Sequence, residues 1–505
     1  MHIKYDTKKS GTHARVLVSV RRGDKVEKEK KHNLGLVLDK ERGIFQNKRR
    51  GVFTYDIATD TFSPPPNDFP LPTRTVRRNE SIVITFGETY LLDSFIKSKG
   101  LDVPISAIDY NNKDTIRAMV AYYILRSAPN SHALDWYEGS YARILYPEAN
   151  LVSQRLSECI HAIGKDTVQR SFFESYFTYI KSKGINTHNI LIDSTGLPNS
   201  VHLHLTAVSN HGGEISNEVR LMYVVDQKTG IPIYYRCFPG NVLDVTTLIR
   251  CIEEINALGL TVDCVIIDAG YYSTENIDEL YRRKIPFVTR LKENLVVFKN
   301  IEKEYAATLE EKVNMVEYNG RYLFIKRVPC TLGTNNGGYA YLGLDLDKNA
   351  SETKSVLSKA KTDKMTIDDV YEKLNKKSLF AIVSSQEIPT SEILPLYYTR
   401  QQIEQVFDVG KTDGKLLPIS VESEQSLNGH LLFAFLANVV LRELQSFLRN
   451  TKLNAKSVFD RLVNHKCQVF DDVIVTLEPF KRANDCYKAF GLIPPINIAR
   501  TKMGS

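Results

Sequence analysis

Two aspartates follow short apolar segments that have the composition of buried strands. Asp193 comes after NILI and Asp268 after CVII, and small or turn-forming residues follow each of them. Open α/β sheets place their functional sites at the carboxyl ends of strands, so we expect both carboxylates at one edge of a sheet. Two carboxylates held side by side repel each other, and a pair of divalent cations with oxygen ligands is the common solution, which also suits phosphoryl chemistry. The alternative is that each aspartate only caps the turn after it.

A third acidic residue lies in the segment SEILPLYYTRQQIEQVFDVGK, which predicts one helix. Its polar residues Tyr397, Arg400, Glu404 and Lys411 fall within an arc of about 60° when each residue turns the helix by about 100°. Its apolar residues occupy the adjoining sector, which we expect to pack on the sheet. The simpler interpretation of the polar margin is an ion pair between Arg400 and Glu404, which are four residues apart.

Strands and helices alternate in the region that must position these residues. Between residues 189 and 290 the pattern predicts the order β-β-β-α-β-α-β, with a hairpin whose QKTG turn ends at Gly230. A further strand at 379–385 precedes the helix that carries Glu404. Residues 295–378 interrupt this order with a hairpin and a polar stretch. The predicted fold class is therefore α/β, with a mixed sheet flanked by helices.

The N-terminal part of the chain has a different charge and pattern. The 505 residues carry a net charge of +7, but residues 1–50 alone hold fifteen Lys and Arg against six Asp and Glu. Strand patterns at 14–20 and 34–38 predict a small basic β-rich module, and residues 88–183 predict helices, because their apolar residues recur every three to four positions. Clustered cations favour a polyanionic partner such as nucleic acid. A solvated charged surface is the alternative.

The remaining composition argues against several classes of protein. Seven scattered cysteines without a C-x-x-C pair argue against a disulfide scaffold and a zinc finger. The start has no apolar leader and the longest apolar stretch, 431–441, is too short to span a bilayer, so we expect a cytosolic protein without a membrane partner. The glycine-rich run 333–340 lacks the Lys and Ser/Thr of a phosphate-binding loop, so we expect no nucleotide cofactor. His202, His204 and His211 could ligate zinc, but no Cys or carboxylate completes a set, and we favour polar loop residues.

The four polar residues of the predicted helix match a known signature. The spacing Y-x2-R-x3-E-x6-K, met by Tyr397, Arg400, Glu404 and Lys411, resembles the YREK signature of bacterial insertion-sequence transposases with a DDE active site. The segments LIDSTG, FPGNVLD and VIIDAGYYSTENIDEL and the apolar helix after NGHLLFAFLA are similar to the same group. The resemblance extends over roughly residues 185–450.

This resemblance implies a catalytic core of the RNase H-like fold that acts on double-stranded DNA. Asp193, Asp268 and Glu404 would be the catalytic residues and the ligands of two Mg²⁺ or Mn²⁺ ions, for cleavage at the terminal inverted repeats of an insertion sequence and strand transfer to target DNA. The residues implied to bind DNA near the cut are Tyr397, Arg400 and Lys411. A homodimer would bring the two element ends together, in the bacterial cytoplasm at the nucleoid. A metal-dependent nuclease without strand transfer and a catalytically inactive DNA-binding repressor are the alternatives.

With this resemblance the chain divides into seven predicted parts. They are a basic β-rich module at 1–62, a Pro-rich linker at 63–87, a helical DNA-end-binding region at 88–186, the first part of the core at 187–294, a β-rich insertion at 295–378, the second part of the core at 379–450 and a helical tail at 451–505.

In relatives, the insertion between the second Asp and the Glu helps to grip the DNA end. Here the insertion contains no tryptophan, since Trp136 is the single one in the chain. If a terminal base is displaced from the duplex, the sequence does not identify the residue on which it stacks. The candidates are Tyr322, Phe324, Tyr339 and Tyr341. Whether a DNA hairpin forms at the end stays open as well.

Overall fold

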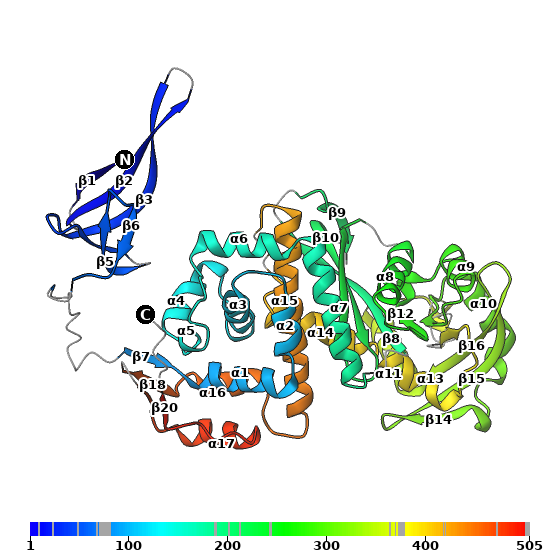
Figure 1. Cartoon of the computed structure of the whole chain (residues 1–505). Coiled ribbons are helices and arrows are strands. Elements are labelled where there is room, and N and C mark those ends of the chain that lie inside the picture. The colour runs from blue at the N-terminus through cyan, green and yellow to red at the C-terminus, as the bar shows by residue number, and fades with distance from the viewer. Residues whose placement is uncertain are drawn as a thin grey trace. The chain divides into compact units, whose positions relative to one another are not determined.

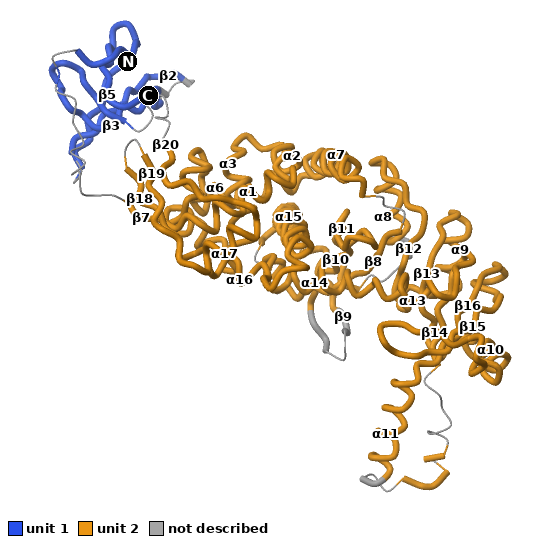
Figure 2. Tube along the Cα trace, turned by 90° about the horizontal axis from the view of Figure 1, so that it is seen from below, with its two compact units in different colours: residues 1–81 blue, residues 82–505 orange. Residues whose placement is uncertain are grey.

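Two units make up the chain, residues 1–81 and residues 82–505 (Figure 2). The computed structural model describes residues 1–8, 11–22, 25–47, 50–66, 69, 82–185, 189–199, 203–211, 214–241, 245–362, 365–368, 370–371, 379–417, 419, 421–470 and 473–499. Most of the predicted linker, 63–87, lies outside the described residues. The last part of that range forms strand β7, Ile82–Thr85, which pairs with β18, Lys466–Val469.

Unit 1 is an antiparallel sheet in which each strand pairs with the next along the chain. The strands are β1 His2–Lys8, β2 Gly11–Arg22, β3 Lys25–Asp39, β4 Ile44–Asn47, β5 Gly51–Asp56 and β6 Thr61–Ser63. β2 and β3 are longer than the predicted strands at 14–20 and 34–38, because their backbone ladder continues to the pair Arg22↔Lys25. The charged run between the predicted strands has no alternation of apolar and polar residues, so the sequence did not indicate a strand there. Backbone hydrogen bonds between strands form without such an apolar face.

Residues 87–182 of unit 2 are helical (Figure 1). The helices are α1 Gly87–Lys99, α2 Asp102–Ala107, α3 Lys113–Leu125, α4 Ala133–Glu138, α5 Ala142–Leu145, α6 Ser153–Ile163 and α7 Asp166–Ser182. They pack on one another and on a long helix from the other end of the chain, α15, Glu424–Leu448.

Helix α15 lies between the helical region and the main sheet (Figure 1). It has 25 residues, many more than the apolar stretch 431–441, and it contacts α3, α6, α14 and β11. The helix is long enough to span a membrane, and its most apolar 18-residue stretch has a mean hydropathy of 1.5. However, 78% of that stretch is buried inside the protein. Its apolar side chains therefore serve as core, as where the rings of Phe435 and Tyr235 lie 5.2 Å apart.

The main sheet of unit 2 has the order β11-β10-β8-β12-β13-β17-β16-β15-β14, with β9 paired to β10. Its first strands and the helices between them are β8 Asn189–Pro198, β9 Ala207–His211, β10 Glu214–Asp226, β11 Pro232–Pro239, α8 Val245–Ala257, β12 Cys264–Ile267, α9 Thr274–Arg282 and β13 Phe287–Arg290. This mixed α/β arrangement confirms the predicted class. The predicted hairpin is also confirmed, since β10 pairs with β11 and Gly230 has a φ of 71° in the turn. Strand β9 was not predicted.

The insertion at 295–378 continues this sheet. Its described elements are α10 Val296–Tyr305, β14 Met315–Tyr318, β15 Arg321–Leu332, β16 Asn336–Asp345 and α11 Leu346–Thr362. Strand β16 pairs antiparallel with β17, Leu379–Ser384, so the three strands of the insertion extend the sheet beyond β17. Helix α11 projects away from the sheet (Figure 2).

The prediction of one continuous helix around Glu404 is wrong, because the segment forms two helices. They are α13 Thr390–Tyr398 and α14 Gln401–Thr412. Between them the backbone N–H groups of Gln402 and Ile403 bond to carbonyls three residues back instead of four. Arg400 keeps right-handed helical angles there, so the side-chain periodicity persists and gives no sign of the break.

The prediction of a helical tail at 451–505 is also wrong for its described residues. They form α16 Ala455–Leu462, β18, β19 Val473–Thr476, α17 Lys481–Ala489 and β20 Asn497–Ala499. The strands join β7 in a sheet of order β20-β19-β18-β7. Cys467 and Ile474 bury their side chains with Ile84 of β7, a contact between distant segments that local periodicity cannot indicate.

Candidate active site

Strands β8 and β12 bring Asp193 and Asp268 to the same edge of the sheet. The two strands are parallel neighbours, and their register ends at the pair Ile192↔Ile267, directly before the two aspartates. Asp268 follows the end of β12, as predicted. The prediction that Asp193 also ends its strand is wrong, because β8 continues to Pro198 through its pairing with β10.

Glu404 reaches the same place from α14. This helix packs against β8 and α15, and Phe407 lies on its buried side. The ring of Phe407 lies 5.4 Å from that of Tyr223, the β10 residue paired with Asp193. Burial of one large aromatic side chain stabilises the folded state by roughly 1.5–3 kcal/mol. The packing of α14 therefore sets the position of Glu404 relative to Asp193.

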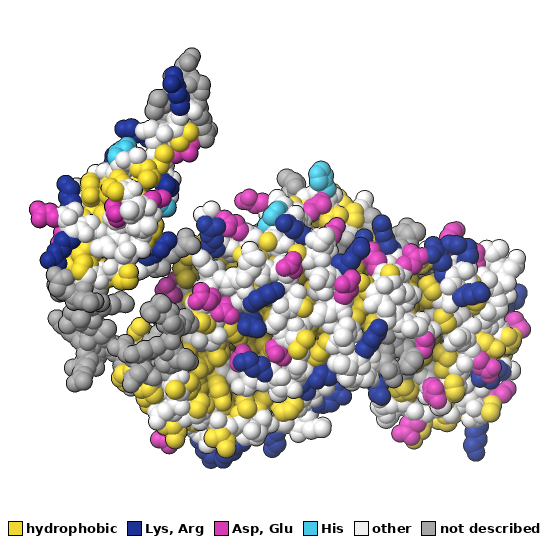
Figure 3. Space-filling view, viewed as in Figure 1, with side chains coloured by type: hydrophobic (Ala, Val, Ile, Leu, Met, Phe, Trp, Pro, Cys, Tyr) yellow, Lys and Arg dark blue, Asp and Glu magenta, His cyan; other side chains and the backbone are white. Residues whose placement is uncertain are grey.

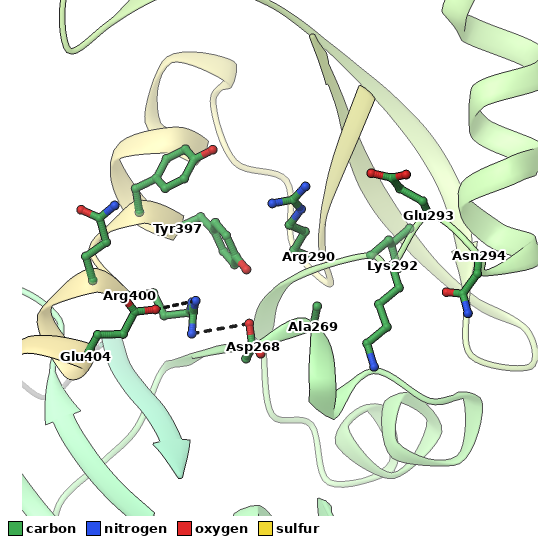
Figure 4. Close-up of a pocket in the computed structure, with 12 residues that line it drawn as sticks. Asp268, Ala269, Arg290, Lys292, Glu293, Asn294, Tyr397, Arg400 and Glu404 are labelled. Carbon is green, nitrogen blue, oxygen red and sulfur yellow. Dashed lines mark hydrogen bonds and ion pairs between the residues drawn. The ribbon is translucent and has the colours of Figure 1, made fainter. Parts of the chain in front are cut away.

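Arg400 binds all three carboxylates. Its Nη1 lies 3.1 Å from Asp193 Oδ2. The same Nη1 lies 3.5 Å from Asp268 Oδ1, and Nη2 lies 2.7 Å from Glu404 Oε1 (Figure 4). Burial opposes the charge of the guanidinium, but the surrounding carboxylates and Tyr397 raise its pKa overall. One guanidinium thus contacts three acids that come from three distant segments of the chain.

Burial weakens the acidity of Asp193. Its carboxyl group is 18% exposed, and this desolvation raises its pKa to about 6, while the backbone N–H of Ser194 and the charge of Arg400 act in the opposite direction. Asp268 and Glu404 repel its charged form further. A nearby cation such as Arg400 therefore favours the charged form of Asp193.

A cleft of about 580 Å³ opens beside the acids. Figure 4 shows Asp268 and Glu404 on its walls together with Arg290, the last residue of β13, and Lys292, two residues further along the chain. The sequence reasoning missed these two cations. The signal was present, because the sequence FVTRLK places Arg290 at the end of a buried strand adjacent to β12 and Lys292 just beyond it.

Charge is mixed on one face of unit 2. On the face drawn in Figure 3, Lys and Arg are interspersed with Asp and Glu over the described surface. At the cleft itself, the cations that could attract an anionic ligand are Arg290, Lys292 and Arg400, which line it.

Tyr397 and Lys411 lie beside the acids and contact protein groups. Tyr397 is 5% exposed and packs edge-on against Tyr398, and burial raises its pKa to about 12. Lys411 Nζ donates a hydrogen bond of 2.7 Å to Thr195 Oγ1 on β8, and burial lowers its pKa. The DNA contacts implied for both residues stay predictions.

Histidines near the acids in sequence differ in their surroundings. His430, in the segment NGHLLFAFLA that is similar to the transposase group, is buried in α15, where its Nδ1 lies 2.8 Å from Tyr123 Oη. His204 is exposed, whereas His202 and the side chain of His211 lie outside the described residues.

The four aromatic residues proposed as stacking partners differ in exposure. Tyr341 is fully buried and donates a hydrogen bond of 2.6 Å to the carbonyl of Ile388, so it belongs to the core. Tyr322 is 54% exposed. A residue that the sequence reasoning did not consider, Tyr318, stacks on Tyr398 at the cleft, with ring centroids 5.6 Å apart.

The chemistry of the three carboxylates fits a hard divalent cation. Oxygen donors are those that Mg²⁺ and Mn²⁺ prefer. Among the residues that the structure describes, no three His, Cys, Asp or Glu side chains are already arranged to hold a metal ion. The guanidinium of Arg400 contacts all three acids instead. A metal would therefore replace this guanidinium between the carboxylates.

Comparisons with known proteins point to one family. The family model described as "Transposase DDE domain" matches residues 182–439, slightly more than half of the chain, and this range contains all three acids. No curated protein matches the chain. Among solved structures, the cryo-EM structure of a piggyBac transposase synaptic complex with hairpin DNA is similar at 10% identity and a TM-score of 0.39, over 76% of this chain and 80% of that chain. A TM-score this low does not demonstrate a shared fold.

Proposed function

The chain belongs to the family of transposases with a DDE domain, and we propose that it cuts DNA at the terminal inverted repeats of an insertion sequence and joins the freed ends to target DNA. The observation that carries this proposal is the meeting of Asp193, Asp268 and Glu404 around one cation at the edge of a parallel pair of strands. The YREK spacing of residues 397–411 supports the same bacterial group.

Strand directions support an RNase H-like core. The strands β11, β10, β8, β12 and β13 are adjacent in that order. Within this set β11, β8, β12 and β13 run in one direction, and β10 runs in the opposite direction. This arrangement supports the RNase H-like core that the resemblance implies, with Asp193 on the middle strand of the five and Asp268 directly after the strand next to it.

Asp193, Asp268 and Glu404 would hold two Mg²⁺ or Mn²⁺ ions. The chemistry supplied by such a bound pair is activation of a water or a DNA 3′-OH and stabilisation of the leaving oxygen during in-line displacement at phosphorus. Arg400 must first leave the carboxylates. Its guanidinium would then be free to pair with a DNA phosphate, which is the role that the YREK signature implies for it.

Arg290 and Lys292 would hold the DNA strand in the cleft. Both line it opposite Glu404, where backbone phosphates would lie if the scissile bond is at the acids (Figure 4). Contacts to phosphate fix the register of a protein on DNA without reading its sequence. Lys411 connects α14 to β8 through Thr195, so a contact of this lysine with DNA would require the hydrogen bond to open. Two element ends must be joined in one reaction, so we expect a homodimer as the active assembly.

Cleavage of a labelled duplex that carries the element's own terminal repeat tests this function. Wild-type protein is expected to cut and join the duplex with Mg²⁺ and to do neither in EDTA. Glu404→Gln is expected to bind the duplex but to lose cleavage by more than about a hundredfold, since changes in groups that only support metal ligands already cost about 10–100-fold. Asp408→Asn, one turn further along α14, is the matched control and should cut normally.

The products separate the proposal from its alternatives. Joined products show a transposase, whereas cleavage without joining would show a nuclease. Binding without either step under any divalent ion would leave the repressor interpretation.

A further inference from the structure

A chain of hydrogen bonds joins the segments that carry Asp193 and Asp268. Tyr271, three residues after Asp268, donates from its hydroxyl to Ser194 Oγ at 3.3 Å. The backbone N–H of Ser194 donates to Asp193 Oδ1 at 2.8 Å. The hydroxyl of Tyr271 thus reaches, through one serine, the residue whose carboxylate faces Arg400.

Both partners of this contact are themselves fixed. Tyr271 is 4% exposed, and its carbonyl accepts a hydrogen bond of 2.9 Å from Asn276 Nδ2 in α9. On the other side, Arg220 of β10 donates from Nη1 to Ser194 Oγ at 3.4 Å. Arg220 is buried in an ion pair of 3.1 Å with Glu218. The contact therefore links α9 and the loop after β12 to strands β8 and β10.

This link lies where the backbone pairing of the two strands stops. The register of β8 with β12 ends at Ile192↔Ile267, one position before the aspartates. Beyond that pair, side chains must hold the two segments at their separation. Tyr271 and Ser194 cross this gap, each within three residues of an aspartate.

We propose that Tyr271 and Ser194 are positioning residues that set the distance between the Asp193 and Asp268 carboxylates, so that both can bind one divalent cation. This inference rests on the proposed function. Arg400 Nη1 already contacts both carboxylates, at 3.1 and 3.5 Å, so the present spacing lets a single group bind the two. A metal binds oxygens at about 2.0–2.1 Å and tolerates misplacement poorly, so losing the link should weaken metal binding before it affects folding.

The test measures equilibrium binding of Mn²⁺ to the full chain without DNA, by the paramagnetic resonance of the free ion. Tyr271→Phe and Ser194→Ala are each expected to raise the Mn²⁺ concentration at half saturation about tenfold, as loss of a group that supports a metal ligand commonly does. Tyr272→Phe removes the same hydroxyl one residue later and should bind like wild type. The Mg²⁺ concentration for half-maximal cleavage should shift in parallel, with unchanged affinity for terminal-repeat DNA.

The double variant Ser194→Ala/Tyr271→Phe separates positioning from general loosening. If the hydrogen bond is the link, the double variant binds Mn²⁺ about as weakly as either single variant. Wild-type affinity in Tyr271→Phe, or fully additive losses in the double variant, would overturn the proposal. A wild-type chain whose Mn²⁺ binding does not depend on Glu404 would instead refute the proposed function, and the inference with it.

Discussion

Arg400 Nη1 lies 3.1 Å from Asp193 Oδ2, although the two residues are 207 positions apart in the chain. The same guanidinium binds Asp268 and Glu404. This one side chain therefore keeps together three carboxylates that would otherwise repel one another. A metal held by the same oxygens would compete with this guanidinium, so the proposed function predicts that metal binding and release of Arg400 are coupled.

Removing the charge of Arg400 is expected to have opposite effects on metal binding and on stability. Arg400→Met should bind Mn²⁺ several-fold more tightly than wild type without DNA, because no cation competes for the acids. The same variant should unfold at a lower temperature in EDTA, because the carboxylates then repel one another. Calorimetric titration and thermal unfolding measure the two effects.

Arg290→Met is the matched control for this prediction, since Arg290 lines the cleft without an ion pair to the three acids. It should leave both quantities near the wild-type values. Weaker Mn²⁺ binding by Arg400→Met than by wild type would show that the guanidinium assists the metal site and does not compete with it.

Asp193 should make the stability of the metal-free protein depend on pH. Its pKa is raised by burial from 3.8 to about 6, so between these values the folded state binds more protons than the unfolded state and stability falls as pH rises. Above pH 6 the full cost is present, at most about 3 kcal/mol, since one pKa unit corresponds to about 1.4 kcal/mol.

Asp193→Asn removes this cost, so in EDTA it should unfold at a higher temperature than wild type at pH 7.5 and at nearly the same temperature near pH 4. Asp408→Asn should show no such difference between the two pH values. If Asp193→Asn is less stable than wild type at pH 7.5, the ion pair with Arg400 outweighs the burial of the carboxylate.

How much of this site the sequence could predict depends on the range of each interaction. Continuous apolar runs indicated the strands before Asp193 and Asp268, because parallel strands that are buried on both faces consist of nearly uninterrupted apolar residues. The pair Arg400–Glu404 was visible from its four-residue spacing and is present at 2.7 Å. The contacts of Arg400 with the two aspartates were not, because they join segments that no local pattern relates.

The sequence did not predict features of the fold that depend on backbone geometry or on pairing between distant strands. Helical periodicity persists through Arg400, so the break between α13 and α14 left no trace in it. The strands of the insertion join the main sheet through β16 and β17, a pairing that depends on the whole domain. The charged hairpin of β2 and β3 lacks an apolar alternation, although its backbone ladder is long.

Lys415 should make stability rise with pH. Lys415 is 7% exposed, and its amine lies 3.6 and 4.7 Å from the ring centroids of Tyr122 and Tyr123 and donates to Asn130 Oδ1. Burial lowers its pKa from 10.5 to about 7, so between these values the unfolded state binds more protons and stability increases with pH.

Lys415→Met should therefore raise the unfolding temperature at pH 6.5, where the charged amine is buried at full cost, and the gain should shrink by pH 9. Lys452 is exposed, so Lys452→Met is the control and should leave the unfolding temperature unchanged at both pH values. A loss of stability at pH 6.5 would mean that the contacts with the tyrosine rings outweigh desolvation.

Lys292 should contribute to DNA affinity through charge alone. It is exposed on the wall of the cleft, two residues after the end of β13, the strand next to β12. A lysine that neutralises one phosphate adds about 0.9 to the slope of log affinity against log salt concentration. Lys292→Met should therefore weaken binding of terminal-repeat and unrelated duplexes by similar factors and reduce that slope by about 0.9 for both. Lys299→Met, on α10 and outside the cleft lining, should leave the slope unchanged. A loss confined to the terminal repeat would mean that Lys292 reads bases, and an unchanged slope would place the DNA outside this cleft.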